Sequence, residues 1–118
     1  MEPLAITMGE PAGIGGEITA AAWSRLRATG PAFFLVDDPD RLARFGAPVE
    51  PIGTPAAANA VFQRALPVLP LTCRVSSALG EPNTATAPQV IRSIRTAVDL
   101  TKTGAASAVV TNPIHKAA

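Results

Sequence analysis

Two segments of this 118-residue sequence hold residue types that could do chemistry. The first is "ITMGEPAGIG", residues 6–15, in which three glycines and a proline surround the carboxylate of Glu10. Glycines allow positive φ angles and let backbone N–H groups approach a ligand closely. A helix that begins after such a turn offers its positive end to an anion. The expected chemistry is binding of an anionic or nucleotide ligand, and the alternative is a purely structural turn between a strand and a helix.

This glycine turn matches neither of the common phosphate-binding patterns. Ile18 stands three positions after Gly15, where the pattern G-x-G-x-x-G requires a further glycine. No Gly-Lys-Ser/Thr sequence follows, as a P-loop would need. The residues alone therefore leave ligand binding and a scaffold role open.

The second segment is "VVTNPIHKAA", residues 109–118. The imidazole of His115 can carry a proton or bind a metal, and Lys116 can pair with a phosphate or a carboxylate. A helix that begins at Pro113 would place both side chains in its first turn. A histidine that stands alone is more often structural, so both interpretations of His115 stay open.

The elements that must position these segments follow from the hydrophobic pattern. Short apolar runs without strict alternation predict three strands buried on both faces, at residues 4–7, 32–36 and 107–111. Helical spacing predicts a helix between the first two strands, with Glu17 near its positive end and a stop at Gly30; its apolar face holds Ile14, Ile18, Ala21, Ala22 and Leu26. A second helix is predicted over residues 87–103, with an apolar stripe of Val90, Ile91, Ile94, Ala97 and Val98.

The middle of the chain is expected to hold three shorter elements. A short helix is predicted to begin at Asp37 or Asp38, and a short strand to cover residues 49–52. The run "LPVLPLTC" predicts another strand, which Pro67 and Pro70 would place at the edge of the sheet. The order of these elements predicts a mostly parallel sheet in an α/β/α layer. Because ligands bind at the carboxyl ends of such strands, both chemical segments are expected at the functional edge.

Composition and charge indicate an ordinary soluble protein. The net charge of +1 with scattered arginines argues against a nucleic-acid surface, and no apolar run is long enough to span a membrane. Cys73 is the only cysteine, which excludes an internal disulfide and a zinc-binding cysteine set. The amino terminus carries an acid and no arginine before Arg25, unlike a secretory signal. A cytoplasmic protein without nucleic-acid or membrane partners is therefore expected.

Two stretches of the sequence are "ITMGEPAGIGGE" and "GEPNTATAPQVIRSIRTAVDLTKTGAASAVVTNPIHKAA". Together they resemble the 4-hydroxythreonine-4-phosphate dehydrogenase (PdxA) family. Met8 and Gly16 replace prolines of the family signature, and the likeness is loose between residues 40 and 78. The resemblance implies two α/β/α domains of the isocitrate and isopropylmalate dehydrogenase type in a longer protein. Residues 1–118 would then be the amino-terminal part of an incomplete first domain, with no internal domain boundary.

The resemblance also implies a reaction. The family oxidises the secondary alcohol of 4-phosphooxy-L-threonine with NAD (NADP is the alternative), and the product loses carbon dioxide on the route to pyridoxal 5′-phosphate. A divalent metal such as Zn, Mg or Co takes part, and the enzyme is a homodimer. The metal ligands and the substrate-holding His-Thr pair would lie beyond Ala118, so this chain would contribute no catalytic or metal-binding residue and be inactive alone.

Positions that match the family motifs give the candidate site residues. The resemblance assigns the turn to the cofactor cleft through Glu10, Gly13, Ile14 and Gly15. It places Thr111 and Lys116 at the border of the substrate cleft. Two further functions stay open: a related dehydrogenase for another phosphorylated or carboxylated hydroxy acid, and a free-standing, non-catalytic module that binds an anion or dimerises.

Overall fold

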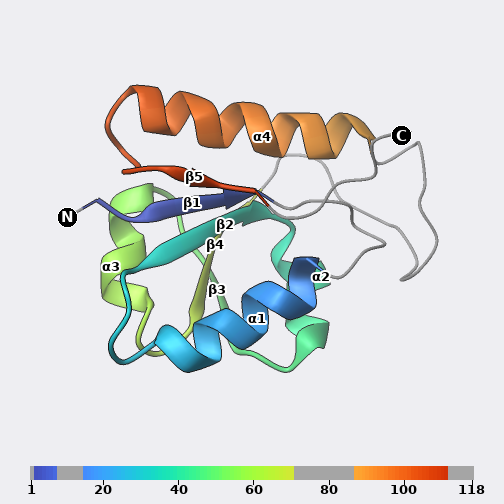
Figure 1. The fold of residues 1–118 in the computed structure, drawn as a ribbon. Helices are drawn as coiled ribbons and strands as arrows, with labels where there is room; N and C mark the ends of the chain where they lie inside the picture. Colours follow the sequence, from blue (N-terminus) through green and yellow to red (C-terminus); the bar gives the residue numbers. More distant parts are fainter. Residues whose placement is uncertain (1, 8–14, 71–86, 112–118) are drawn as a thin grey trace.

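The computed structural model describes residues 2–7, 15–70 and 87–111, which form a parallel sheet between two layers of helices (Figure 1). The strands of this part are β1 (Leu4–Thr7), β2 (Phe33–Asp37), β3 (Val49–Pro51), β4 (Leu66–Pro70) and β5 (Val109–Val110). Its helices are α1 (Gly15–Leu26), α2 (Pro39–Leu42), α3 (Ala58–Val61) and α4 (Ala87–Lys102), with single 3-10 turns η1 (Ala43–Phe45) and η2 (Pro55–Ala57).

The sheet has the strand order β3-β4-β2-β1-β5, and every neighbouring pair is parallel. Ile6 of β1 pairs with Leu35 on one side and with Val110 on the other. The predicted parallel α/β arrangement is therefore confirmed. The short strand predicted at residues 49–52 is also confirmed, as β3.

The helices divide between the two faces of the sheet according to the direction of the chain. From β1 to β3 the chain moves toward one edge, and Trp23 of α1 and Leu42 of α2 pack on one face. The chain then returns, and Val61 of α3 and Ala97 of α4 pack on the other face. A reversal of direction with a change of face keeps all crossovers of the same hand, as expected for parallel strands.

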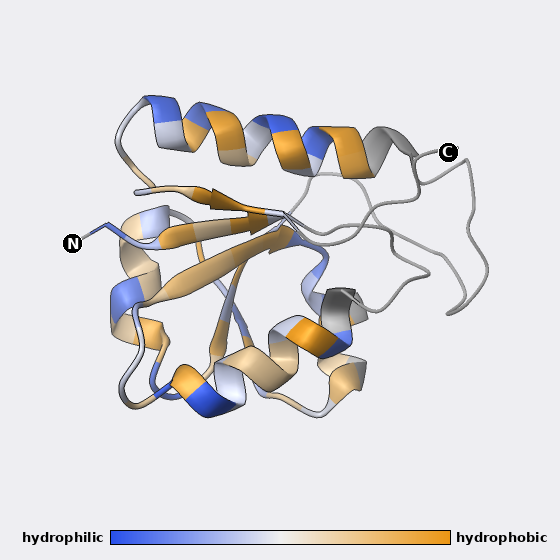
Figure 2. Cartoon of the chain, in the orientation of Figure 1, coloured by the Kyte–Doolittle hydropathy of each residue, from blue (hydrophilic) through white to orange (hydrophobic). Residues whose placement is uncertain are grey.

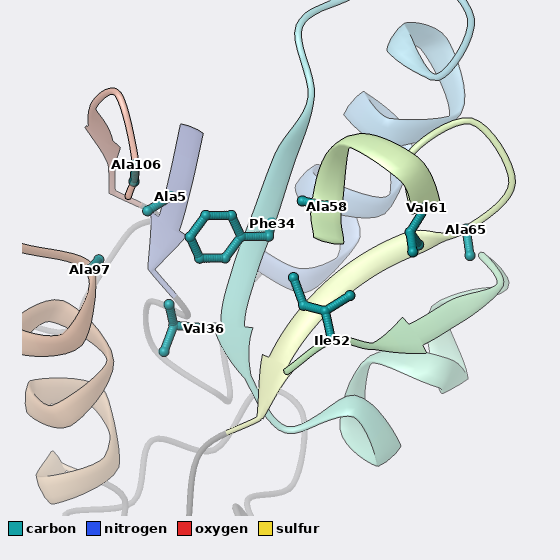
Figure 3. Packing of buried hydrophobic residues seen from close by; sticks show 9 residues of the cluster. All are labelled: Ala5, Phe34, Val36, Ile52, Ala58, Val61, Ala65, Ala97 and Ala106. Carbon is teal, nitrogen blue, oxygen red and sulfur yellow. The ribbon is translucent and has the colours of Figure 1, made fainter. Parts of the chain in front are cut away.

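The central strand β2 is buried on both faces. Phe34 and Val36 point into the cluster under α3 and α4 (Figure 3), whereas Phe33 and Leu35 point into the cluster under α1 and α2. Burying each such side chain contributes roughly 1.5–3 kcal/mol. This two-sided burial explains the continuous apolar run in the sequence, and the strands accordingly carry the orange of apolar residues in Figure 2.

The prediction that β4 lies at an edge was wrong, because β4 lies between β3 and β2. The N–H of Leu66 donates to the carbonyl of Pro48 (2.8 Å), and the carbonyl of Val68 accepts from the N–H of Ile52 (2.9 Å). Residues 66, 68 and 70 therefore turn their backbone groups toward β3, and residues 67 and 69 turn theirs toward β2.

Both prolines of β4 stand where the ladder needs no N–H group. Pro67 faces β2, but the register between β2 and β4 begins only at the pair Leu35–Val68. Pro70 turns its backbone nitrogen toward β3. However, β3 ends at Pro51, which pairs with Val68, so no residue of β3 lies opposite Pro70. A proline can thus stand in an inner strand when its missing donor falls before or after the neighbouring strand.

The strand predicted at residues 107–111 is shorter and less buried than expected. Val109 and Val110 form β5, and Val110 is 44% exposed. The physical reason is position: within the described residues β5 pairs with β1 on one side only, and α4 covers the face that holds Val109.

The buried face of α1 also differs from the prediction. Thr19, Ala20 and Trp23 are buried, whereas Ile18 is 46% exposed and Ala21 is exposed. The indole Nε1 of Trp23 donates to the carbonyl of Phe62 at 2.7 Å, and the large ring lies in the core beneath the helix. Burial of the largest side chain, rather than of the most hydrophobic stripe, sets the rotation of α1.

Helix α4 confirms the element predicted over residues 87–103, but its apolar stripe is only partly covered. Val90 and Ala97 are buried together with Ser93. Ile94 and Val98 are half-buried, and Ile91 is 56% exposed. The apolar surface of α4 is therefore wider than the part of the helix that contacts the sheet.

Candidate functional site

The carboxyl ends of the parallel strands meet at one edge of the sheet. Thr7 ends β1, Asp37 ends β2 and Pro70 ends β4, while Thr111 directly follows β5. Thr7 and Asp37 are fully buried, whereas Thr111 is exposed. Open α/β sheets bind ligands outside this edge, so it is the candidate site.

Two neighbouring strands send the chain to opposite faces at this edge. From β2 the chain enters α2, on the face that α1 covers, whereas the chain beyond β4 leads to α4 on the other face. Such a divergence opens a crevice between the strand ends. In the described part of the chain this point lies where Asp37 pairs with Pro70. The sequence did not reveal it, because it depends on the strand order.

Two acidic residues hold the backbone at the end of β2. The N–H of Asp38 donates to Oδ1 of Asp37 at 2.6 Å, and the N–H of Asp40 donates to Oδ1 of Asp38 at 3.0 Å. Asp38 is therefore the N-cap of α2, which confirms one of the two predicted helix starts. Asp37 is the last residue of the strand, and its carboxylate fixes the turn that follows.

Helix α4 is tied to the same end of β2. The buried hydroxyl of Ser93 donates to the carbonyl of Val36 at 2.7 Å, one residue before Asp37. The sequence analysis did not single out Ser93. The available signal was its spacing, since a serine three residues after Val90 and four before Ala97 lies on the buried face of the helix.

The two chemical segments continue from neighbouring strands. Because Ile6 pairs with Val110, Thr7 and Thr111 follow at the same edge of the sheet. The glycine turn continues from Thr7, and the segment that holds His115 continues from Thr111. The expectation that both segments begin at one edge is therefore confirmed for the residues from which they start.

The structure describes two of the six predicted site residues. Gly15 is the first residue of α1, and Glu17 lies in the first turn of the helix, as predicted. Thr111 lies in exposed coil directly after β5. The remaining four predicted positions, like His115, lie outside the described residues, and their roles stay predictions: Glu10, Gly13, Ile14 and Lys116.

The described residues hold a surface ion pair, Glu50 with Arg64, and no cluster of metal-ligating side chains. Within residues 2–7, 15–70 and 87–111, no three His, Cys, Asp or Glu side chains are grouped so that they could hold a metal. The hydrogen bonds from Arg64 lower the pKa of the Glu50 carboxyl, and Glu50 in turn raises the pKa of Arg64. Over the same ranges, no helix has the length and apolar character needed to cross a membrane.

A parallel sheet with helices on both faces, whose chain diverges at the carboxyl ends of neighbouring strands, is the arrangement of open α/β proteins, which bind ligands at that edge. The model of one protein family, pyridoxal phosphate biosynthetic protein PdxA, matches residues 32–118 of this chain. The chain belongs to the PdxA family.

Individual relatives agree with this assignment. The 4-hydroxythreonine-4-phosphate dehydrogenase of Methylorubrum populi is 51% identical to this chain, over 97% of its length. That of Caulobacter vibrioides is 45% identical, over 98% of the chain. The chain spans 35% of the length of each.

Solved structures give the same result for the fold. The crystal structure of 4-hydroxythreonine-4-phosphate dehydrogenase from Klebsiella pneumoniae superposes with a TM-score of 0.81 at 30% identity, over 98% of this chain and 38% of that one. The enzyme from Burkholderia phymatum, at 20% identity and a TM-score of 0.82 over 99% of this chain and 38% of its own, shares the fold. The expected isocitrate and isopropylmalate dehydrogenase type of fold is confirmed.

Proposed function

We propose that this chain is the amino-terminal part of an enzyme of pyridoxal 5′-phosphate biosynthesis, a 4-hydroxythreonine-4-phosphate dehydrogenase. The observation that supports this most is the 51% identity, over 97% of the chain, to a relative with that name. The proposed reaction is oxidation of the secondary alcohol of 4-phosphooxy-L-threonine with NAD, or alternatively NADP, followed by loss of carbon dioxide. The proposed setting is a cytoplasmic homodimer without nucleic-acid or membrane partners.

The carboxyl edge of the sheet suggests how this chain would contribute. The turn with Gly13 would bring backbone N–H groups to the anionic part of the cofactor. Lys116 would pair with an anionic group of the substrate. Thr7 and Asp37, both fully buried, would hold the strand ends from which these segments continue. The protein then supplies position and electrostatics, and the nicotinamide accepts the hydride.

The described residues do not fit the divalent metal that the resemblance implies, because they include no cluster of metal-ligating side chains. Metal ligands and the catalytic groups would belong to the further two-thirds of chain found in the relatives. We therefore expect the 118-residue chain alone to be inactive.

The deciding experiment measures the protein from its source cells. Antibody capture against this segment followed by intact-mass measurement should give about three times 12.1 kDa, since the chain spans 35% of the relatives. The captured protein should reduce NAD with 4-phosphooxy-L-threonine and a divalent metal. Activity only with other phosphorylated or carboxylated hydroxy acids would favour a related dehydrogenase. A mass of 12.1 kDa without activity would overturn the proposal in favour of a non-catalytic module.

The cofactor assignment has its own test. In the captured full-length enzyme, Gly13→Val should raise the KM for NAD several-fold, because a branched side chain blocks the close approach of the backbone. The KM for 4-phosphooxy-L-threonine serves as the control and should change less. An unchanged KM for NAD in a stable variant would reduce the turn to a scaffold.

A further inference from the structure

Helix α1 is fixed to the rest of the chain near its carboxyl-terminal end. The indole Nε1 of Trp23 donates to the carbonyl of Phe62 at 2.7 Å, and this bond is buried. Directly after the helix, Nε of Arg27 donates to the carbonyl of Gln63 at 2.9 Å. The guanidinium of Arg27 also lies 5.2 Å from the centre of the Trp23 ring, which attracts the cation. These two side chains and the two consecutive carbonyls are here called the α1 clamp.

The α1 clamp holds a part of the backbone that is itself well fixed. The N–H of Phe62 donates to the carbonyl of Ala58 at 2.9 Å, and the N–H of Ala65 donates to that of Val61 at 3.0 Å. The ring of Phe62 packs edge-on against Phe33 of β2, with the ring centres 4.8 Å apart. Strand β4 begins directly after this turn. The clamp therefore ties α1 to the two inner strands, β2 and β4.

The first half of α1 rests on the sheet through small side chains. Of its described residues, Thr19 and Ala20 are buried, whereas the larger Ile18 is half exposed. Small side chains form no large ridge that would fix the height of a helix over its neighbour. A hydrogen bond is directional, so the bond of Trp23 selects one height and one rotation of the helix. We therefore expect the position of the whole helix to follow the α1 clamp.

The opposite end of α1 lies at the candidate site. Figure 1 shows that α1 runs antiparallel to β1, so the helix begins at the carboxyl edge of the sheet. Gly15 is its first residue and directly continues the glycine turn. Trp23 stands eight residues later, about 12 Å along the helix axis. Because a helix of this length moves as one body, a displacement at Trp23 also displaces Gly15.

We propose that Trp23 and Arg27 are positioning residues for the cofactor, because they set the place of Gly15 and of the turn that precedes it. Neither side chain touches the cofactor, and both act through the backbone of α1. This inference rests on the proposed binding of NAD by the glycine turn. Backbone N–H groups bind an anionic group well only at hydrogen-bond distance, so a shift of about 1 Å weakens the binding of NAD.

The test changes the donors of the α1 clamp in the full-length enzyme. Trp23→Phe keeps an aromatic ring in the core and removes the Nε1–H donor. It should raise the KM for NAD at least about threefold, while kcat and the KM for 4-phosphooxy-L-threonine change less. Amide hydrogen exchange of residues 15–22 should become at least about threefold faster, because the start of the helix is held less firmly.

Two changes at Arg27 grade the effect. Arg27→Met keeps an unbranched stem and removes both the charge and the donor, so it should change the KM for NAD in the same direction but less than Trp23→Phe. Arg27→Lys keeps a cation for the Trp23 ring and a donor for Gln63, and it should restore most of the affinity for NAD. An Arg27→Lys enzyme as impaired as Arg27→Met would contradict the clamp as the cause.

A matched control separates positioning from stability. Ile52→Val shortens a buried side chain in the cluster on the other face of the sheet, so it should lower the Tm without raising the KM for NAD. A Trp23→Phe enzyme with a lower Tm and an unchanged KM for NAD overturns the proposal, as does an equal rise of this KM in Ile52→Val.

Failure of the proposed function has a different signature. In that case the unchanged enzyme does not reduce NAD, and the hydrogen exchange of residues 15–22 still decides whether the clamp positions the start of α1. Faster exchange in Trp23→Phe, but not in Ile52→Val, supports the positioning role. Equal exchange in the unchanged enzyme and in Trp23→Phe overturns it.

Discussion

The two edges of the sheet are built differently. At the β3 edge, the backbone nitrogen of Pro51, which has no hydrogen to donate, faces away from β4. In the same strand, Glu50 forms two hydrogen bonds with Arg64. Proline and charges are devices that prevent further strand pairing. At β5, the last described strand on the other side, Val109 and Val110 carry neither device, and Val110 is 44% exposed. The comparison teaches that, among the described strands, β3 carries features that prevent further strand pairing and β5 does not.

The sharpest test of this comparison removes one apolar side chain at each edge. Ile52, directly after β3, is buried in the core cluster, so Ile52→Ala should lower the free energy of unfolding by about 2–5 kcal/mol. Val110→Ala should lower it by less than about 1 kcal/mol, because Val110 is 44% exposed and buries less apolar surface. Urea denaturation measures both. Equal losses would mean that the edges do not differ as described.

Much of this fold could be predicted from the sequence because its signals are local. Residues 4–7 and the helix over 87–102 follow from apolar periodicity and capping residues near each element. The inner position of β4 could not be predicted, because it depends on where neighbouring strands begin and end. The rotation of α1 depends on a bond between Trp23 and Phe62, 39 residues apart.

In the candidate site, too, the local features could be predicted from the sequence and the long-range arrangement could not. The glycine turn and the segment with Lys116 were located from their residue types, and the pairing of Ile6 with Val110 confirms that they start at one edge. The point between Asp37 and Pro70 where the chain leaves for opposite faces required the strand order β3-β4-β2-β1-β5, which no local pattern contains. Buried polar anchors such as Ser93 were missed for the same reason, since their partners are distant in sequence.

A functional test asks whether the β5 side of the sheet serves the reaction rather than the stability. Lys116→Ala in the full-length enzyme should lower kcat/KM about tenfold to a hundredfold, the range expected for loss of a charged hydrogen bond. The Tm should stay unchanged, in contrast to Ile52→Ala at the β3 side. Steady-state kinetics and thermal melting of the same preparation measure both values. Full activity would refute the assignment of Lys116 to the substrate cleft.

A third test compares two hydroxyl groups that donate to backbone carbonyls, that of Ser93 on α4 and that of Thr103 directly after α4. Ser93→Ala removes the buried bond to Val36 and should cost about 1–3 kcal/mol, because the carbonyl loses its partner away from water. Thr103→Ala removes the exposed bond to Leu100 at 3.1 Å and should cost less than about 0.5 kcal/mol. Denaturant unfolding compares the two variants. A harmless Ser93→Ala change would mean that α4 is held to β2 by apolar packing alone.

The smallest expected effect is the pH dependence of the closed β3 edge. The hydrogen bonds from Arg64, followed by its charge, lower the pKa of the Glu50 carboxyl from its ordinary value in the folded chain. A lowered folded-state pKa stabilises the fold above the unfolded-state value, and this stabilisation is lost as the pH falls through the lowered value. The raised pKa of Arg64 adds no further dependence in the measurable range, since both forms of the chain keep that guanidinium charged. The side chain of Arg64 is 63% exposed and that of Glu50 is 39% exposed, so the contribution to stability is small and screened by salt.

Glu50→Gln should therefore lower the Tm slightly at neutral pH and low salt, and the difference from the unchanged chain should vanish in acid and at high salt. A difference that persists under both conditions would show that Glu50 acts through packing at this edge rather than through its charge.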